Sequence, residues 1–186
     1  MGEIKSAWEI AQEKANRLGK LSAEEKEQQE RQKYHQIGQV LAQKWLDSSR
    51  RPNITEELSK YEERERETIK QALIEHLAEV IELTTTPGIN STKKVIEALS
   101  SLGPELQPKA EEIGQLVQEY EGEEQKIRQE LESSYRETLH KLRISGSAVD
   151  AINIEVDPKW QPAHRGLVES FTPRLNELKR ALMSSP

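Results

Sequence analysis

The sequence contains no cysteine and few aromatic residues: one Phe, three Trp and four Tyr among 186 positions. The lack of cysteine excludes disulfide bonds, thiolate metal sites and cysteine nucleophiles. The mean hydropathy is -0.83 and 32% of the residues are charged, so a single thick hydrophobic core is not expected. A thin, elongated structure with a narrow apolar seam needs fewer apolar side chains and fits this composition.

Long apolar runs are also missing. No stretch approaches the roughly 18 apolar residues that suggest a transmembrane helix, and the N-terminal residues lack the apolar centre of a signal peptide. The net charge of -6 provides no basic face for phosphate contacts, which argues against nucleic acid as a partner. We expect a cytoplasmic protein that binds neither nucleic acid nor membranes.

What the sequence does contain is apolar residues at helical spacing along most of its length. Capping signals, glycines and prolines set the ends of these segments. The expected helices cover residues 3–18, 23–49, 55–83, 92–102 and 106–143. The predicted fold class is all-α: an elongated, coiled-coil-like helical bundle with one long heptad helix. Residues 1–144 form the elongated helical region, and residues 145–186 form a C-terminal extended arm and a short terminal helix.

The helix at 106–143 has the most regular pattern. Apolar or small residues, with Glu124 among them, keep a four-three spacing over about five heptads, which predicts a narrow helix–helix seam. The seam positions are Leu106, Ala110, Ile113, Val117, Tyr120, Glu124, Ile127, Leu131, Ser134 and Thr138. Spacing alone leaves the partner helix open: it is either the helix at 55–83 of the same chain or a second copy of 106–143, which would make a homodimer.

The segment after Arg143 breaks the helical pattern. Ile152, Ile154 and Val156 alternate with polar residues, as in a strand with one buried face. Trp160 follows, next to two prolines, and the apolar spacing then resumes in a final helix that prolines kink or restart. We expect the arm to lie on an apolar surface, either that of its own bundle or that of a partner, with Trp160 as its anchor.

No catalytic or metal-binding motif is present. The spacing Glu137-x-x-His140 occurs in di-iron bundles, but those sites need a second such motif and two further glutamates. We therefore expect no catalytic residue, no cofactor and no metal, and a protein that is not an enzyme. The predicted function is a non-enzymatic helical scaffold or adaptor for self-association or another, unknown protein; the alternative is an accessory chaperone or assembly factor with a client-binding C-terminal arm. The predicted interaction residues are Ile152, Ile154, Val156, Trp160, Ile113, Val117, Tyr120, Ile127 and Leu131.

The opening "MGEIKSAWEIAQEKANRLGK", the stretch "SGSAV" at 145–149 and the later Trp160 resemble a family of uncharacterised bacterial helical proteins. Members of that family have a similar Met-Gly-Glu-Ile-Lys-Ser opening, which leads into a charged helical body. The resemblance implies a bacterial cytoplasmic protein and brings no activity with it.

Overall fold

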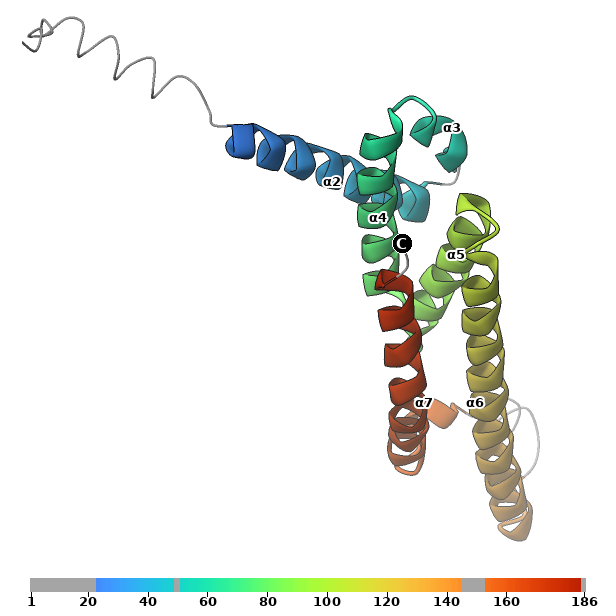
Figure 1. Ribbon diagram of the computed structural model, residues 1–186. Coiled ribbons are helices and arrows are strands. Elements are labelled where there is room, and N and C mark those ends of the chain that lie inside the picture. The colour runs from blue at the N-terminus through green and yellow to red at the C-terminus, as the bar shows by residue number, and fades with distance from the viewer. Residues whose placement is uncertain (1–22, 49–50, 145–152, 185–186) are drawn as a thin grey trace, which may run out of the picture.

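The computed structural model describes residues 23–48, 51–144 and 153–184, and within these ranges every regular element is a helix (Figure 1). The helix expected at 3–18 and Ile152 lie outside the described residues. The elements are α2 (Ala23–Asp47), α3 (Ile54–Leu58), α4 (Glu63–Val80), α5 (Thr86–Leu102), α6 (Gln107–Lys141), the 3-10 helix η2 (Ile154–Val156) and α7 (Trp160–Met183). The all-α fold class is confirmed.

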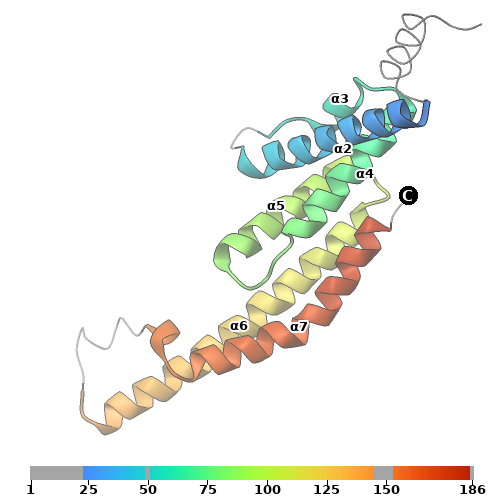
Figure 2. The same cartoon turned by 90° about the vertical axis from the view of Figure 1, so that its left-hand side faces the viewer.

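The molecule is elongated along the axis of α6. Figures 1 and 2 show α7 beside α6, α4 and α5 above them, and α2 crossing α4 at the end where α3 lies. The C-terminal end of α6 extends beyond α7 at the opposite end. The two helices are antiparallel. Lys109 near the start of α6 bonds to Ala181 near the end of α7, whereas Arg128, further along α6, contacts Trp160 at the start of α7.

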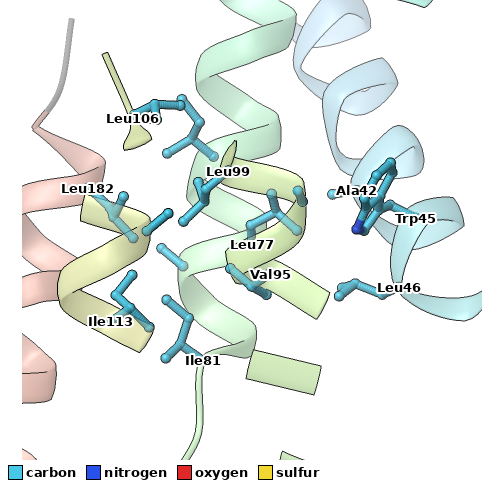
Figure 3. Packing of buried hydrophobic residues seen from close by; sticks show 14 of the residues in the cluster. Ala42, Trp45, Leu46, Leu77, Ile81, Val95, Leu99, Leu106, Ile113 and Leu182 are labelled. Carbon is cyan, nitrogen blue, oxygen red and sulfur yellow. The ribbon is translucent and has the colours of Figure 1, made fainter. Parts of the chain in front are cut away.

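The hydrophobic core is a narrow layer that all five long helices share. Trp45 of α2, Leu77 of α4, Leu99 of α5, Ile113 of α6 and Leu182 of α7 are all buried and point into this layer (Figure 3). The α2 end is also held by polar contacts, because the indole Nε1 of Trp45 donates to the backbone oxygen of Lys94 at 3.1 Å. The core is thin, as the composition predicts, but it is continuous from α2 to α7.

The crossing of α2 and α4 depends on a close backbone approach at Gly38. A Cβ atom at this position would lie 2.8 Å from the Cβ of Ala72 and closer still to the carbonyl oxygen of Ile69. Real Cβ contacts are essentially never that short. The absence of a side chain at Gly38 therefore sets how closely α2 packs on α4.

The helix expected at 55–83 is two helices, α3 and α4, and it ends earlier, at Val80. Asn53 caps α3 by accepting from the backbone N–H of Glu56. Glu62 and Glu65 form a capping box that starts α4. The side chain of Arg66 donates to the backbone oxygens of Leu58 and Tyr61, and the Leu58 oxygen also accepts from the N–H of Tyr61. The break falls where the apolar pattern has a gap, because residues 62–68 include no apolar side chain.

The helix expected at 92–102 begins earlier, at Thr86. Thr85 is its N-cap and accepts from the backbone N–H of Gly88 at 3.0 Å, and a proline occupies the first turn. Thr92 lies inside α5 and is fully buried. Its hydroxyl bonds to the backbone of Glu82, which fixes the loop between α4 and α5. The residues before the expected start at 92 therefore already belong to the helix, from Thr86 onward.

The arm differs from the expected extended strand in the residues that the structure describes. Residues 154–156 form the 3-10 helix η2, in which Ile154 is buried but Val156 is 76% exposed. The side chain of Asn153 accepts from the backbone N–H of Glu155, and that of Asp157 accepts from Lys159. Such local bonds offer the backbone an alternative to an extended conformation. Ile154 and Val156 therefore do not share one buried apolar face.

The terminal helix α7 is longer than expected. It runs without a break from Trp160 to Met183 and contains Pro173 in its interior. Figure 2 shows that α7 bends as it follows α6. Proline lacks the N–H that would bond one turn back, and its ring crowds that carbonyl, which accounts for a bend without a restart.

Candidate interaction surfaces

The heptad seam of α6 is covered within the chain over its first half only. Ile113, Val117 and Tyr120 are fully or almost fully buried, and the helices that cover them are α7 and α5. The expected internal partner, the helix at 55–83, does not take this place. Further along, Glu124, Ile127 and Leu131 are half-buried, and the remaining seam positions, Ser134 and Thr138, are exposed.

Trp160 anchors the start of α7 on α6. Its indole is 5% exposed and stacks on the imidazole of His164, with ring centres 5.2 Å apart. The guanidinium of Arg128 lies 4.4 Å from the indole centre, within cation–π range. The Tyr120 hydroxyl lies 3.0 Å from Nε2 of His164, and its ring meets Phe171 edge to face. These contacts join two helices that are far apart in the sequence.

Charged groups complete this cluster. Arg128 donates to Glu124 on α6 and to Glu155 on η2, each at 3.1 Å. Burial, together with the negative charge of Glu124, raises the pKa of Tyr120 to about 12. Glu124, which the sequence placed inside the seam, therefore lies at its boundary and pairs with a cation. Arg128 connects α6, η2 and α7, so the described part of the arm packs on the helical bundle of its own chain.

The end of α6 carries exposed apolar side chains. We call residues 135–144 the α6 tip; it includes Tyr135, Leu142 and Ile144, which are 37%, 64% and 46% exposed. Tyr135 hydrogen-bonds to Asp157, which places the exposed Val156 next to the tip, and burial and this bond raise the pKa of Tyr135. Among the described residues, four of the six exposed large apolar side chains lie on or beside this tip.

A second apolar surface lies at the other end of the molecule, between α2 and α3. This groove, the α2 groove, has a volume of about 440 Å³. Its lining residues are Lys33, Gln36, Ile37, Val40, Leu41, Lys44, Glu57 and Tyr61. Val40 is 53% exposed, and in the described part of α2 it is the one large apolar side chain that is exposed. Sequence reasoning missed this surface because Val40 lies at the edge of the apolar stripe of α2: it is close to Ile37, three positions earlier, but turned away from the buried Leu41.

A larger groove of about 700 Å³ lies between α2 and α4 and is lined mainly by glutamine and charged side chains. Within the described ranges, no three histidine, aspartate or glutamate side chains are grouped as metal ligands would be. His140 lies on the α6 tip, where Glu137 pairs with Lys141 instead, at 3.9 Å. None of the helices in these ranges combines the length and apolar character needed to cross a bilayer.

Comparison with known proteins gives one match. The sequence model of a family of unknown function (DUF6657) matches residues 55–184, which include nearly all of α3 and the whole of α4 to α7. Searches of curated proteins and of solved structures gave no match. The matched part contains the α6 tip and the Trp160 cluster, whereas α2 precedes it. With more than half of its length matched, the chain belongs to this family of unknown function, DUF6657.

Proposed function

We propose that the protein is a non-enzymatic helical scaffold or adaptor, and that it associates with a protein surface through the α6 tip. The observation that carries this proposal is the group of exposed apolar side chains on and beside the tip, which includes Leu142 and Val156. Contiguous apolar surface on a small protein is a mark of an interaction site. A helix end that extends beyond its bundle presents such side chains to a partner from several directions.

The α6 seam supports the same proposal. Its first half is filled by α7 and α5, whereas Leu131 is only half-buried and Thr138 is exposed. A heptad pattern that continues past the last covering helix provides a surface for helix–helix pairing with another chain. The proposal includes the finer expectations from the sequence: a protein partner, an oligomer and a cytoplasmic location.

The alternative function, an accessory chaperone with a client-binding arm, has less support. Ile154 and Trp160 are buried against the chain's own helices, and Val156 is the exposed apolar side chain of the described part of the arm. An arm that binds clients would need to release these buried side chains, at a cost of about 1.5–3 kcal/mol for each large apolar residue.

Site-specific photo-cross-linking tests the proposed function. A photoreactive amino acid replaces Leu142 on the tip, and in a matched control it replaces Met183, which is 40% exposed at the other end of α7. We expect intermolecular adducts from position 142 in cells, and clearly fewer from position 183. The additional substitution Val156→Asp should reduce the adducts at 142. Equal yields from both positions would show that the tip is not an interaction surface.

A further inference from the structure

The two exposed apolar surfaces of this chain match each other. Resting on the proposed function, we propose that the α6 tip of one copy binds in the α2 groove of a second copy, so that the chains associate head to tail. Figures 1 and 2 show the tip and α2 at opposite ends of the molecule. A tip therefore cannot fill the groove of its own chain, and the occupant has to come from another copy.

The apolar side chains of the two surfaces have compatible spacing. Leu139 and Leu142 are three positions apart and share one face at the end of α6. Ile37 and Val40 are related in the same way on α2. Leu142 and Val40 are 64% and 53% exposed in the single chain, so each has apolar surface left to bury. Helices that dock in grooves are held by side chains at this spacing.

The groove is long enough for the helical part of the tip. The groove follows α2 from Lys33 to Lys44, about 16 Å at ~1.5 Å per residue. The helix of the tip, from Tyr135 to the end of α6 at Lys141, spans about 9 Å by the same measure. The groove can therefore accept this helix end together with Leu142, its C-cap residue.

The charges around the two surfaces are complementary. The tip carries three cationic side chains, Arg136, Lys141 and Arg143, against one carboxylate, Glu137. Next to the groove lies a corner with an excess of acidic side chains, in which four glutamates, among them Glu30, Glu62 and Glu65, stand against two arginines. Tyr34 of this corner packs edge to face on Tyr61 of the groove, which places the two surfaces side by side. The groove itself carries Lys33 and Lys44 against Glu57, so the complementary charges for the cations of the tip come from the adjacent acidic corner, and the lysines of the groove are matched by Glu137 alone.

The negative potential of the corner acts on Tyr34. The bond to Glu65 and partial burial, followed by the charges of Glu65, Glu30 and Glu62, raise the pKa of Tyr34 to about 12. A negative field of this kind favours the approach of a basic helix end. A contact between two different surfaces leaves one tip and one groove free in each dimer, so the association continues into open chains or closes into a ring.

Two variants and their mixture test this arrangement. Val40→Asp places a charge in the groove, and Leu142→Asp places one on the tip; Met183→Asp is the control outside both surfaces. We expect light scattering to show a mass that rises with concentration for the natural chain and the control. Each of the two variants should associate at least about tenfold more weakly, because an apolar contact would bury an unpaired charge.

An equimolar mixture of the two variants distinguishes the contact between tip and groove from a contact between two tips. Val40→Asp retains an intact tip and Leu142→Asp an intact groove, so an equimolar mixture should form a dimer with one functional junction. If Leu142→Asp alone prevents association and mixing restores nothing, tips pair with tips and the inference is wrong, although the proposed function survives.

Two further outcomes would also overturn the inference. A chain that stays monomeric at all concentrations but cross-links to other proteins from position 142 has a different partner. A lower melting temperature for Val40→Asp without a change in mass would show that the groove is filled by the chain itself. Unchanged circular dichroism at low concentration verifies that both variants are folded. Failure of the proposed function is seen separately, as the absence of adducts from position 142.

Discussion

Gly38 and Gly122 both lie inside long helices, but their surroundings are opposite. At Gly38 a Cβ atom would overlap with α4, whereas at Gly122 it would meet no atom within 4 Å. We predict that Gly38→Ala lowers the free energy of unfolding by about 1–3 kcal/mol through overpacking. Gly122→Ala should raise it by about 1 kcal/mol, because alanine favours the helix. Urea denaturation measures both values.

Each of these variants serves as the control for the other, since the substitution is the same. A stable Gly38→Ala variant would mean that α2 shifts on α4 at no cost. A destabilised Gly122→Ala variant would mean that another chain packs against this part of α6, which would itself be informative about association.

Single residues were predictable where their role is local. Asn53 precedes the expected helix at 55–83, where a cap belongs, and it does cap α3. Thr92, the first residue of the expected helix at 92–102, is instead buried inside α5 and bonds to the backbone ten residues earlier. For Trp160 the sequence left two roles open. Its environment is set by Arg128, a residue 32 positions away, and no local pattern contains that contact.

At the scale of elements, the attachment of α7 to α6 through Arg128 and Trp160 leads to a measurable coupling. We predict that Trp160→Ala lowers the free energy of unfolding by about 3 kcal/mol or more, because a large buried side chain is lost. Arg128→Ala should cost less, and the double variant should cost less than the sum of the two. The expected coupling energy is about 0.5–2 kcal/mol, from the cation–π contact.

Arg136→Ala is a suitable control for this cycle. Arg136 pairs with Glu132 one turn away at 3.3 Å, and its side chain is 57% exposed. An exposed pair of this kind contributes only a few tenths of a kcal/mol. Purely additive effects of Arg128→Ala and Trp160→Ala would show that the two groups do not stabilise each other.

Elements were predictable to different degrees, for a physical reason. The expected helix at 106–143 agrees closely with α6, because a long seam with one period leaves little choice. The expected helix at 55–83 misses the break before α4, because the long polar stretch 62–68 that contains the capping box of Glu62 and Glu65 also fits the exposed face of one continuous helix. The arm was predicted as a strand from its alternation alone. The side chains of Asn153 and Asp157 accept hydrogen bonds from nearby backbone N–H groups, which favours a local helical turn over an extended strand.

For the whole molecule, the elongated arrangement predicts the result of small-angle X-ray scattering. A compact globule of this length has a radius of gyration of about 16 Å. We expect a larger value, extrapolated to zero concentration so that self-association does not contribute. The α6 axis and the crossing α2 spread the mass along one direction (Figure 1). A radius near 16 Å at high dilution would contradict this shape.

The low hydropathy of the sequence predicts a thin, elongated molecule and the helical spacing of its apolar residues predicts the all-α class, but the partners of each helix could not be predicted. A heptad stripe shows that α6 has a partner and does not identify it. The structure pairs α6 with α7 and α5, and leaves the α6 tip uncovered among the described residues. Which stripes meet depends on how loops reverse the chain, and the loop residues carry no periodic signal.

The placement of α7 has a consequence for the order in which the protein folds during synthesis. Leu182 is completely buried, and the side chains of Lys179 and Gln71 connect α7 with α4 across about a hundred residues of chain. The ribosome makes α4, α5 and α6 before α7, so their shared apolar layer stays open until α7 has emerged. Contacts between such distant segments form late and slow the final step. The nascent chain therefore passes through a stage that requires protection from aggregation, and only the arrival of α7 ends it.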